Sequence, residues 1–213
     1  IVFGSFSAAG QKDFKRLVAY SSINHMGFVV LAIAAAAFVG GSTDDSLRMS
    51  ATIAVNGAVL QMFNHGITSA GMFFLVGILY DRTHTRVLAN YGGLYAILPV
   101  YGSILLFMSM ASLGLPGLNG FVSEFMIVRG TWPIFTAYTA ISMIGLIFTG
   151  VYVMKALYLV LYGPLNEQWA GKLNDISVRE TLVVIPLILL ILSIGLWPAW
   201  ILNLINGAVA AWL

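Results

Sequence analysis

The stretch Ser50–Leu79, SATIAVNGAVLQMFNHGITSAGMFFLVGIL, contains 30 residues and no Asp, Glu, Lys or Arg. A helix needs about 20 mainly apolar residues to cross the hydrocarbon core of a bilayer. This stretch is longer than that, which permits tilt or projection beyond the bilayer. It therefore predicts a membrane-spanning helix. It also raises the question of why a histidine, His65, lies at its centre among amides and hydroxyls.

The whole chain has the composition of a membrane protein. Of its 213 residues, 60% are hydrophobic and 8% are charged, whereas about 25% of the residues in an average soluble domain are charged. So few charges cannot cover the surface of a soluble fold, and we expect lipid to contact much of it. Cysteine is absent, which excludes disulfides and thiolate-held iron–sulfur centres within these residues. We find no basic cluster that suggests nucleic acid binding.

Apolar stretches of this kind recur along the chain. They predict an all-α polytopic bundle, a single membrane domain over 1–213, with about five transmembrane helices at residues 17–39, 50–79, 97–128, 132–162 and 181–202. Ile1–Gly10 is similar to the end of a sixth apolar helix that lacks its beginning. Because an initiator Met and a signal-peptide pattern are both absent, we expect the chain to be the C-terminal part of a longer protein.

Positive residues gather on alternate loops. If the five predicted helices cross the membrane in turn, seven of the ten Lys and Arg residues lie in loops on one side of it and two lie on the other side. The tenth, Lys155, lies inside a helix. The seven are Lys12, Lys15, Arg16, Arg82, Arg86, Lys172 and Arg179, and the two are Arg48 and Arg129. The positive-inside rule therefore predicts that the loop of Lys12 is cytoplasmic and that the C-terminus is on the outer side.

The third stretch contains a helix break, LGLPGLNG, at residues 113–120. Pro116 lacks a backbone donor, and three glycines surround it: Gly114, Gly117 and Gly120. A break within a membrane is tolerated where the freed backbone groups are buried in protein or face a watery cavity. Glu124 follows one turn later, near the positive end of the restarting helix, where a carboxylate can ionise or accept a proton. The alternative is a proline kink with a glutamate near the outer interface.

Two histidines lie inside predicted helices. His65 is 14 residues from Ala51 and from Leu79, or about 20 Å from either helix end. Three polar residues share its face: Gln61, Thr68 and Ser69. His25, in YSSINHMGF, lies about 12 Å inside the first helix. Imidazole can take up and release a proton near neutral pH, so His25, His65 and Glu124 are candidates for a proton relay. The alternative is that each histidine only holds helices together by hydrogen bonds.

Lys155 is a secondary candidate, because it either extends toward the inner surface or carries a proton in its neutral form. Gln61, Thr68 and Ser69 are also secondary candidates. The motifs GxxxxGK[ST], GxGxxG, HExxH and CxxC are absent, so we find no nucleotide, zinc-protease or thiol site and predict no metal site. A b-type haem would need His25 and His65 as ligands, but their polar surroundings favour a hydrated relay.

Three long strings extend this interpretation: DFKRLVAYSSINHMGF, FNHGITSAGMFFLVGILYDRTHTR and ASLGLPGLNGFVSEF. In this order and spacing they closely resemble the antiporter-like subunits of proton-pumping NADH:quinone oxidoreductase (complex I), of the subunit 4 or chain M type. The resemblance covers essentially the whole chain. It implies a bundle of about fourteen helices in two inverted repeats, of which this chain holds the last five and a fragment before them.

The resemblance also implies roles. His25 and His65 match the family's central histidines, and Glu124 matches the acidic residue on its broken helix. Lys155 departs in part, because the family often has a basic residue closer to the YGP end of this helix. The implied function is proton translocation coupled to quinone reduction elsewhere. No cofactor is expected in this chain, whereas NADH, FMN, iron–sulfur clusters and quinone are expected in partner subunits.

The partners implied are other membrane subunits of complex I, especially neighbouring antiporter-like subunits, and the lipid bilayer. The bacterial cytoplasmic membrane is the expected location, with the mitochondrial inner and thylakoid membranes as alternatives. Two other functions stay open. One is a subunit of a multisubunit cation/proton antiporter, which shares these motifs. The other is a structural membrane spacer whose polar residues only pack helices.

Overall fold

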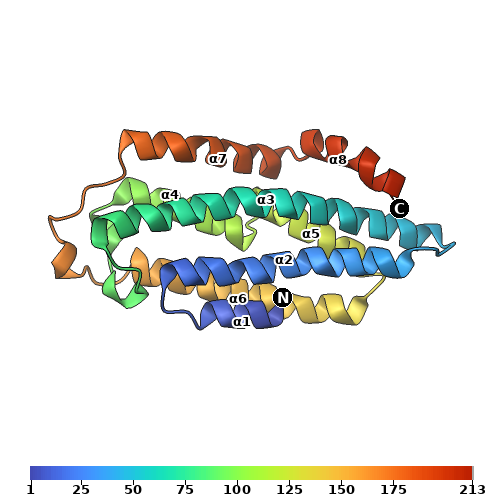
Figure 1. The fold of residues 1–213 in the computed structure, drawn as a ribbon, viewed down its shortest axis with the longest axis horizontal. Coiled ribbons are helices and arrows are strands. Elements are labelled where there is room, and N and C mark those ends of the chain that lie inside the picture. The colour runs from blue at the N-terminus through green and yellow to red at the C-terminus, as the bar shows by residue number, and fades with distance from the viewer. Residues whose placement is uncertain (213) are drawn as a thin grey trace.

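The computed structural model describes residues 1–212 and is an elongated bundle of helices (Figure 1). The α-helices are α1 (Val2–Ala9), α2 (Phe14–Val39), α3 (Asp45–Thr83), α4 (Pro99–Leu113), α5 (Asn119–Thr131), α6 (Thr136–Val160), α7 (Val178–Leu196) and α8 (Ala199–Trp212). Three short 3₁₀ helices, η1 (Leu88–Asn90), η2 (Leu94–Ala96) and η3 (Glu167–Trp169), lie in loops. No strand occurs among residues 1–212, which confirms the all-α prediction.

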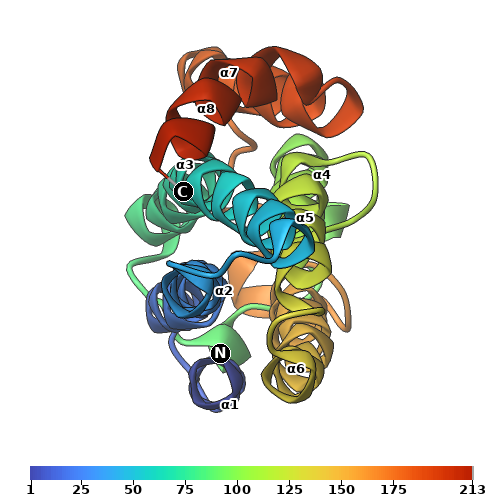
Figure 2. The same ribbon diagram turned by 90° about the vertical axis from the view of Figure 1, so that its right-hand side faces the viewer.

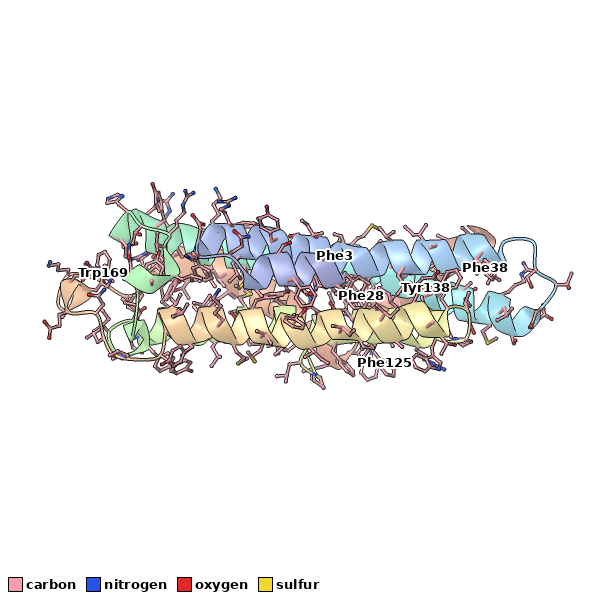
Figure 3. All side chains as sticks on the ribbon, turned by 90° about the horizontal axis from the view of Figure 1, so that it is seen from below. Phe3, Phe28, Phe38, Phe125, Tyr138 and Trp169 are labelled. Carbon is pink, nitrogen blue, oxygen red and sulfur yellow. The ribbon has the colours of Figure 1, made fainter. Side chains whose placement is uncertain are left out.

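Four of these helices, α2, α3, α6 and α7, are long and apolar enough to cross a membrane. Seen along the bundle, α3, α2 and α1 form one row, α4 and α5 followed by α6 form a second, and α7 with α8 covers one edge (Figure 2). Phe28 lies fully buried between helices, whereas Phe3, Phe38, Phe125 and Tyr138 lie on the surface (Figure 3). Large exposed apolar side chains all around the bundle are what a lipid-facing surface requires.

One end of the bundle, here called the basic end, carries Arg82 in the last turn of α3 and the loops of Lys12 and Lys172. Hydrogen bonds and an ion pair join its loops to the helices. Phe14 donates its backbone N–H to the backbone oxygen of Arg86 (2.8 Å). Arg82 pairs with Glu180 at the start of α7 (2.7 Å). The Asp175 carboxylate accepts the backbone N–H groups of Val100 and Tyr101 in the first turn of α4 (2.8 and 2.9 Å). This end is therefore a fixed frame for α2, α3, α4 and α7.

Two helix boundaries differ from those predicted. The predicted helix 50–79 extends over Asp45–Thr83, because the Asp44 side chain accepts the backbone N–H groups of Ser46 and Leu47 and starts the helix earlier. The predicted helix 181–202 ends at Leu196, and α8 starts at Ala199. Pro198 at this junction has no backbone N–H to continue the helix. The predicted helices 17–39 and 132–162 correspond to α2 and α6.

The predicted break in the third stretch is present, since α4 ends at Leu113 and α5 starts at Asn119. Gly114 (φ 81°) and Gly117 (φ 93°) take left-handed conformations that favour glycine. The bend also depends on close backbone contact. A Cβ at Gly195 of α7 would lie 2.5 Å from Leu118 Cα, so α7 rests directly on the connection between α4 and α5. The conformation of the break is therefore fixed by the packing of α7 as well as by its own glycine turns.

Candidate functional site

The centre of the site is a buried pair formed by α2 and α5. His25 Nδ1 lies 2.8 Å from Glu124 Oε1, and the two residues are 2% and 5% exposed. Asp13 caps the start of α2 by accepting the N–H of Arg16, and His25 lies about three turns further into the bundle. The break places Glu124 opposite it. A buried charge needs a partner to be tolerated, and each of these side chains supplies one for the other.

A set of amides and a hydroxyl holds Glu124 in position. Gln61 Nε2 on α3 donates to Glu124 Oε1 (3.1 Å), and the Ser123 hydroxyl donates to Gln61 Oε1. Asn64 Nδ2 donates to Ser123 Oγ (3.0 Å) and to the backbone oxygen of Asn119 (2.8 Å) at the start of α5. The second oxygen of Glu124 faces the break, where a Cβ at Gly114 would lie 3.2 Å from it. The carboxylate is therefore fixed by α3 and by the break together.

His65 lies beside His25 rather than against Glu124. The two imidazole rings have centroids 5.2 Å apart, with an angle of 37° between their planes. His65 Nε2 is 2.9 Å from Ser22 Oγ on α2 and 3.0 Å from Ser69 Oγ on its own helix. Histidine nitrogens bonded to hydroxyls can act as donor or acceptor, so His65 can change its protonation without losing its partners.

A small cavity of about 10 Å³ joins the two histidines to the carboxylate. Its lining consists of polar side chains from α2, α3 and α5 with small residues of α4 and α5: His25, Gln61, Asn64, His65, Thr68, Ala111, Ser112, Gly120 and Glu124. A space of about this volume, with several polar partners, is near the lower limit for one water molecule. One water is enough to connect the two rings, because their centroids are only 5.2 Å apart.

The structure brings together His25, His65, Glu124, Gln61 and Ser69. Thr68 lines the cavity, but its hydroxyl donates to the backbone oxygens of Asn64 and His65. Of the residues at the break, Gly120 lines the cavity and Gly114 faces Glu124, whereas Pro116 and Gly117 lie in the connection. His84 ends α3 in a left-handed conformation, exposed at the basic end.

Lys155 lies apart from these groups. Its ammonium donates to the backbone oxygens of Ala9 (2.7 Å) and Gln11 (3.0 Å). These carbonyls belong to the last turn of α1 and to the loop after it. A cation there satisfies carbonyls that the helix leaves unpaired and opposes the negative end of its dipole. The structure thus places the Lys155 ammonium at the end of α1.

Several residues of the site were not singled out from the sequence: Ser22 as a partner of His65, Asn64, Ser112, Asn119, Ser123 and Tyr152. Tyr152 Oη and Ser112 Oγ lie 3.3 and 3.4 Å from His25 Nε2. The helical period offered one signal, because Asn64 lies three residues after Gln61 and so shares its face. Ser112 lies just before the predicted break, and Tyr152 lies one turn before Lys155, but no pattern in the sequence marks either side chain as a partner of His25.

These features define a class. The chain is a polytopic membrane protein in which a discontinuous helix presents an acidic group to titratable side chains inside the bundle, an architecture typical of ion transporters. It belongs to the family described as NADH:quinone oxidoreductase/Mrp antiporter, transmembrane, which matches residues 1–151.

Individual relatives agree with this assignment. The chain is 37% identical over 210 residues to NADH-quinone oxidoreductase subunit M of Rhodobacter capsulatus, covering 99% of this chain and 38% of the relative. The Escherichia coli K12 subunit M is also 37% identical over 210 residues, covering 98% and 38%. NADH-ubiquinone oxidoreductase chain 4 of Chondrus crispus is 34% identical over 206 residues, covering 97% and 39%. The chain therefore spans about two fifths of the length of these relatives.

Two solved structures share the fold. Respiratory complex I from Thermus thermophilus with bound NADH contains a chain that superposes with a TM-score of 0.82 at 26% identity, covering 99% of this chain and 42% of that one. The membrane-bound sulfane sulfur reductase, an archaeal respiratory membrane complex, gives a TM-score of 0.79 at 25% identity, with 98% and 39% covered. The resemblance seen in the sequence is thus confirmed at the level of the family.

Proposed function

We propose that this chain is part of a subunit of respiratory NADH:quinone oxidoreductase that moves protons across the membrane, driven by quinone reduction in other subunits. The observation that carries the proposal is the buried His25–Glu124 pair at the helix break (2.8 Å). The curated relatives cited above are named as subunits of this enzyme, which supports it over a stand-alone cation/proton antiporter.

The proposed relay uses both nitrogens of His25. A proton bound at Nε2 makes the ring a cation, and the ring then releases the Nδ1 proton to Glu124 Oε1. The ring is neutral again after this step, and Glu124 is protonated. One proton has moved across the imidazole, no other bond has changed, and the two nitrogens have exchanged their roles. His65 exchanges protons with His25 through a water in the 10 Å³ cavity.

The fixed surroundings of Glu124 suit a carrier that must hold and release a proton. Gln61 donates a hydrogen bond to the carboxylate, and His25 Nδ1 lies 2.8 Å from the same oxygen. A shift of His25 or of the break changes these contacts. We propose that the driving subunits act in this way, by displacing charge or moving a helix.

The orientation and environment follow from the same proposal. The basic end faces the cytoplasm and the C-terminus lies on the outer side, in a bacterial cytoplasmic membrane. Neighbouring antiporter-like subunits contact the bundle, and NADH, FMN, iron–sulfur clusters and quinone bind in other subunits. Among residues 1–212 no group of three or more His, Asp or Glu side chains is arranged to hold a metal ion.

The test is Glu124→Gln in the full-length subunit within the assembled complex. We expect proton pumping per NADH oxidised in membrane vesicles to fall at least about tenfold, because an amide cannot carry the proton. Glu167→Gln, an exposed residue of η3, is the matched control and keeps pumping unchanged. Full pumping by an assembled Glu124→Gln complex contradicts the proposal. Sodium transport without NADH oxidation identifies an antiporter instead.

A further inference from the structure

A second internal cavity lies between α2, α3, α4 and α6. Its volume is about 20 Å³, enough for a water molecule. Half of the residues that line it carry hydroxyl groups: Ser21, Ser69, Ser109, Ser112 and Tyr152. We call this space the hydroxyl cavity. Its other lining residues are apolar: Leu17, Val18, Met72, Val153 and Ala156.

The hydroxyl cavity meets both histidines on the side away from Glu124. Ser112 lines this cavity and also the 10 Å³ cavity of the site. Tyr152 Oη and Ser112 Oγ lie 3.3 and 3.4 Å from His25 Nε2, while His25 Nδ1 is bonded to Glu124. Ser69 Oγ lies 3.0 Å from His65 Nε2. Each imidazole therefore has a nitrogen bonded to a hydroxyl of this lining.

The hydroxyl cavity extends from the histidines toward the basic end. Along α2, which starts at the basic end with Phe14, the lining residues Leu17 and Ser21 come before His25. Leu17 is eight residues from His25, or about 12 Å along the helix. Along α6, which ends at the same end of the bundle, Ala156 lies beyond Tyr152. Both helices thus place the cavity between the site and the basic end.

In the opposite direction the buried residues of α2, α3 and α5 are mainly apolar. Six buried residues of α2, α3 and α5 form one cluster, here called the apolar seal: Phe28, Val29, Ala32, Ala54, Ala58 and Ile127. The backbones of α3 and α5 touch there, since a Cβ at Gly57 would lie 2.8 Å from the backbone nitrogen of Ile127. Ile127 follows Glu124 by one turn toward the end of α5. The first buried residue of α5 one turn beyond Glu124 is therefore apolar, and the buried polar residues Asn56 and Thr131 lie beside and beyond it.

We infer that, in this conformation, the His25–Glu124 pair exchanges protons with the basic end through the hydroxyl cavity. Tyr152 and Ser112 are the groups that pass the proton to His25. A hydroxyl donates its hydrogen to Nε2 and takes one from a protonated water in the cavity, so its O–H bond is restored and a neutral water remains. The extra proton on that water comes from the basic end. The Nδ1 proton then goes to Glu124. This inference rests on the proposed function and adds the side of access and two proton-passing residues.

The test is the double variant Tyr152→Phe with Ser112→Ala in the assembled complex. We expect pumping to fall about fivefold, the effect of losing one to two hydrogen bonds. We also expect Glu124 to take up its proton more slowly. The carbonyl absorption of the protonated side chain in infrared difference spectra measures this rate. A merely structural role would not slow it. The matched control removes the same hydroxyls from exposed positions on the same helices, Tyr138→Phe with Ser103→Ala.

A second measurement reports the side of access directly. Because these 213 residues contain no cysteine, single cysteines can be placed here without a background from them. Ser21→Cys should react with Ag⁺ added at the basic end, and Ala58→Cys in the apolar seal should resist Ag⁺ added at the opposite end. Reaction of Ser21→Cys only from the opposite end overturns the inference.

The two proposals fail in different ways. If Glu124→Gln stops pumping but the double variant pumps and reprotonates Glu124 at the normal rate, the hydroxyl cavity is not the route and the proposed function stands. If Glu124→Gln pumps normally, the proposed function itself fails. Slower reprotonation in the double variant, with normal rates in its matched control, supports the inference.

Discussion

The parts of α2 on the two sides of His25 differ in chemistry. Toward the basic end the chain reads LVAYSSIN, and its serines reach the hydroxyl cavity and His65. Toward the opposite end it reads MGFVVLAIAAAAFV, and its buried residues join the apolar seal. A pump needs unequal access to its carrier, because a carrier open to both faces would let protons run back. Here one helix supplies polar groups on one side of the proposed carrier and apolar residues on the other.

The two sides also pack differently. Around the hydroxyl cavity the helices are held apart by side chains and leave room for water. At the apolar seal they touch through small residues, and small residues are what allow membrane helices to approach closely. Opening the seal therefore requires α3 and α5 to separate, whereas the hydroxyl cavity only needs its side chains to reorient.

The largest expected effect is at the boundary between the two sides. His25→Leu removes the imidazole that connects the hydroxyl cavity to Glu124, and pumping should fall about a hundredfold, as on removal of a general acid–base group. Proton uptake by membrane vesicles during NADH oxidation measures it. His84→Leu, at an exposed position, is the control. Retention of pumping by an assembled His25→Leu complex would take this histidine out of the path.

The next largest effect concerns the close packing of α3 against α5 at the apolar seal. Gly57→Leu places a side chain against the backbone of Ile127 and should destabilise the subunit by about 3 kcal/mol. Gly66→Leu on the same helix meets nothing within 4 Å and should cost far less. Thermal denaturation of the purified complex compares the two variants. Equal losses would show that the contact between α3 and α5 is not tight.

A subtler variant separates polarity from volume. Val29 in the seal and Val153 in the hydroxyl cavity are both 5% exposed, and replacing either by Thr keeps its shape while adding a hydroxyl. Each change should cost about 1–2 kcal/mol of stability. Only Val29→Thr should increase the passive leak of protons across vesicles without NADH, because only the seal blocks them. A larger leak from Val153→Thr would reverse the comparison.

Lys155 provides a smaller and purely structural effect. Lys155→Met removes the bonds to the end of α1 and should lower stability by about 1 kcal/mol. Pumping by the assembled complex should stay normal, because the ammonium is bonded to the end of α1 and to the loop after it rather than to His25 or Glu124. A loss of pumping at unchanged stability would show that Lys155 takes part in proton transfer.

The smallest expected effect is on stability, at Asp44, which lies in the loop before α3 at the end of the bundle opposite the basic end. Hydrogen bonds from the Ser46 hydroxyl and from the backbone hold the pKa of Asp44 below its ordinary value of 3.8. The ionised form is thus favoured in the folded state, and its stabilisation is present above pH 3.8 and lost as the pH falls through the lower folded value. Asp44→Asn should lower the melting temperature slightly at pH 7, and the difference should vanish in acid.

Local signals explain what the sequence predicted. Pro116 and its neighbouring glycines mark the break by their own backbone chemistry, and His65 with Gln61 and Ser69 follows the helical period. The pairing of His25 with Glu124 joins residues 99 positions apart, so it depends on how α2 meets α5, which no local pattern reports. Tyr152 and Ser112 were missed for the same reason. Pro198 does carry a local signal, but the surrounding residues are apolar throughout and match a continuous span.

The contact of Gly195 with the connection between α4 and α5 has a consequence for biogenesis. A ribosome makes this connection before it makes α7, because synthesis runs from the N-terminus. Gly195 lies 71 residues after Glu124, so it can dock on the bend only after the carboxylate and its partners on α2 and α3 have been made. The bend beside the proposed carrier is thus covered late, by a residue that has no side chain.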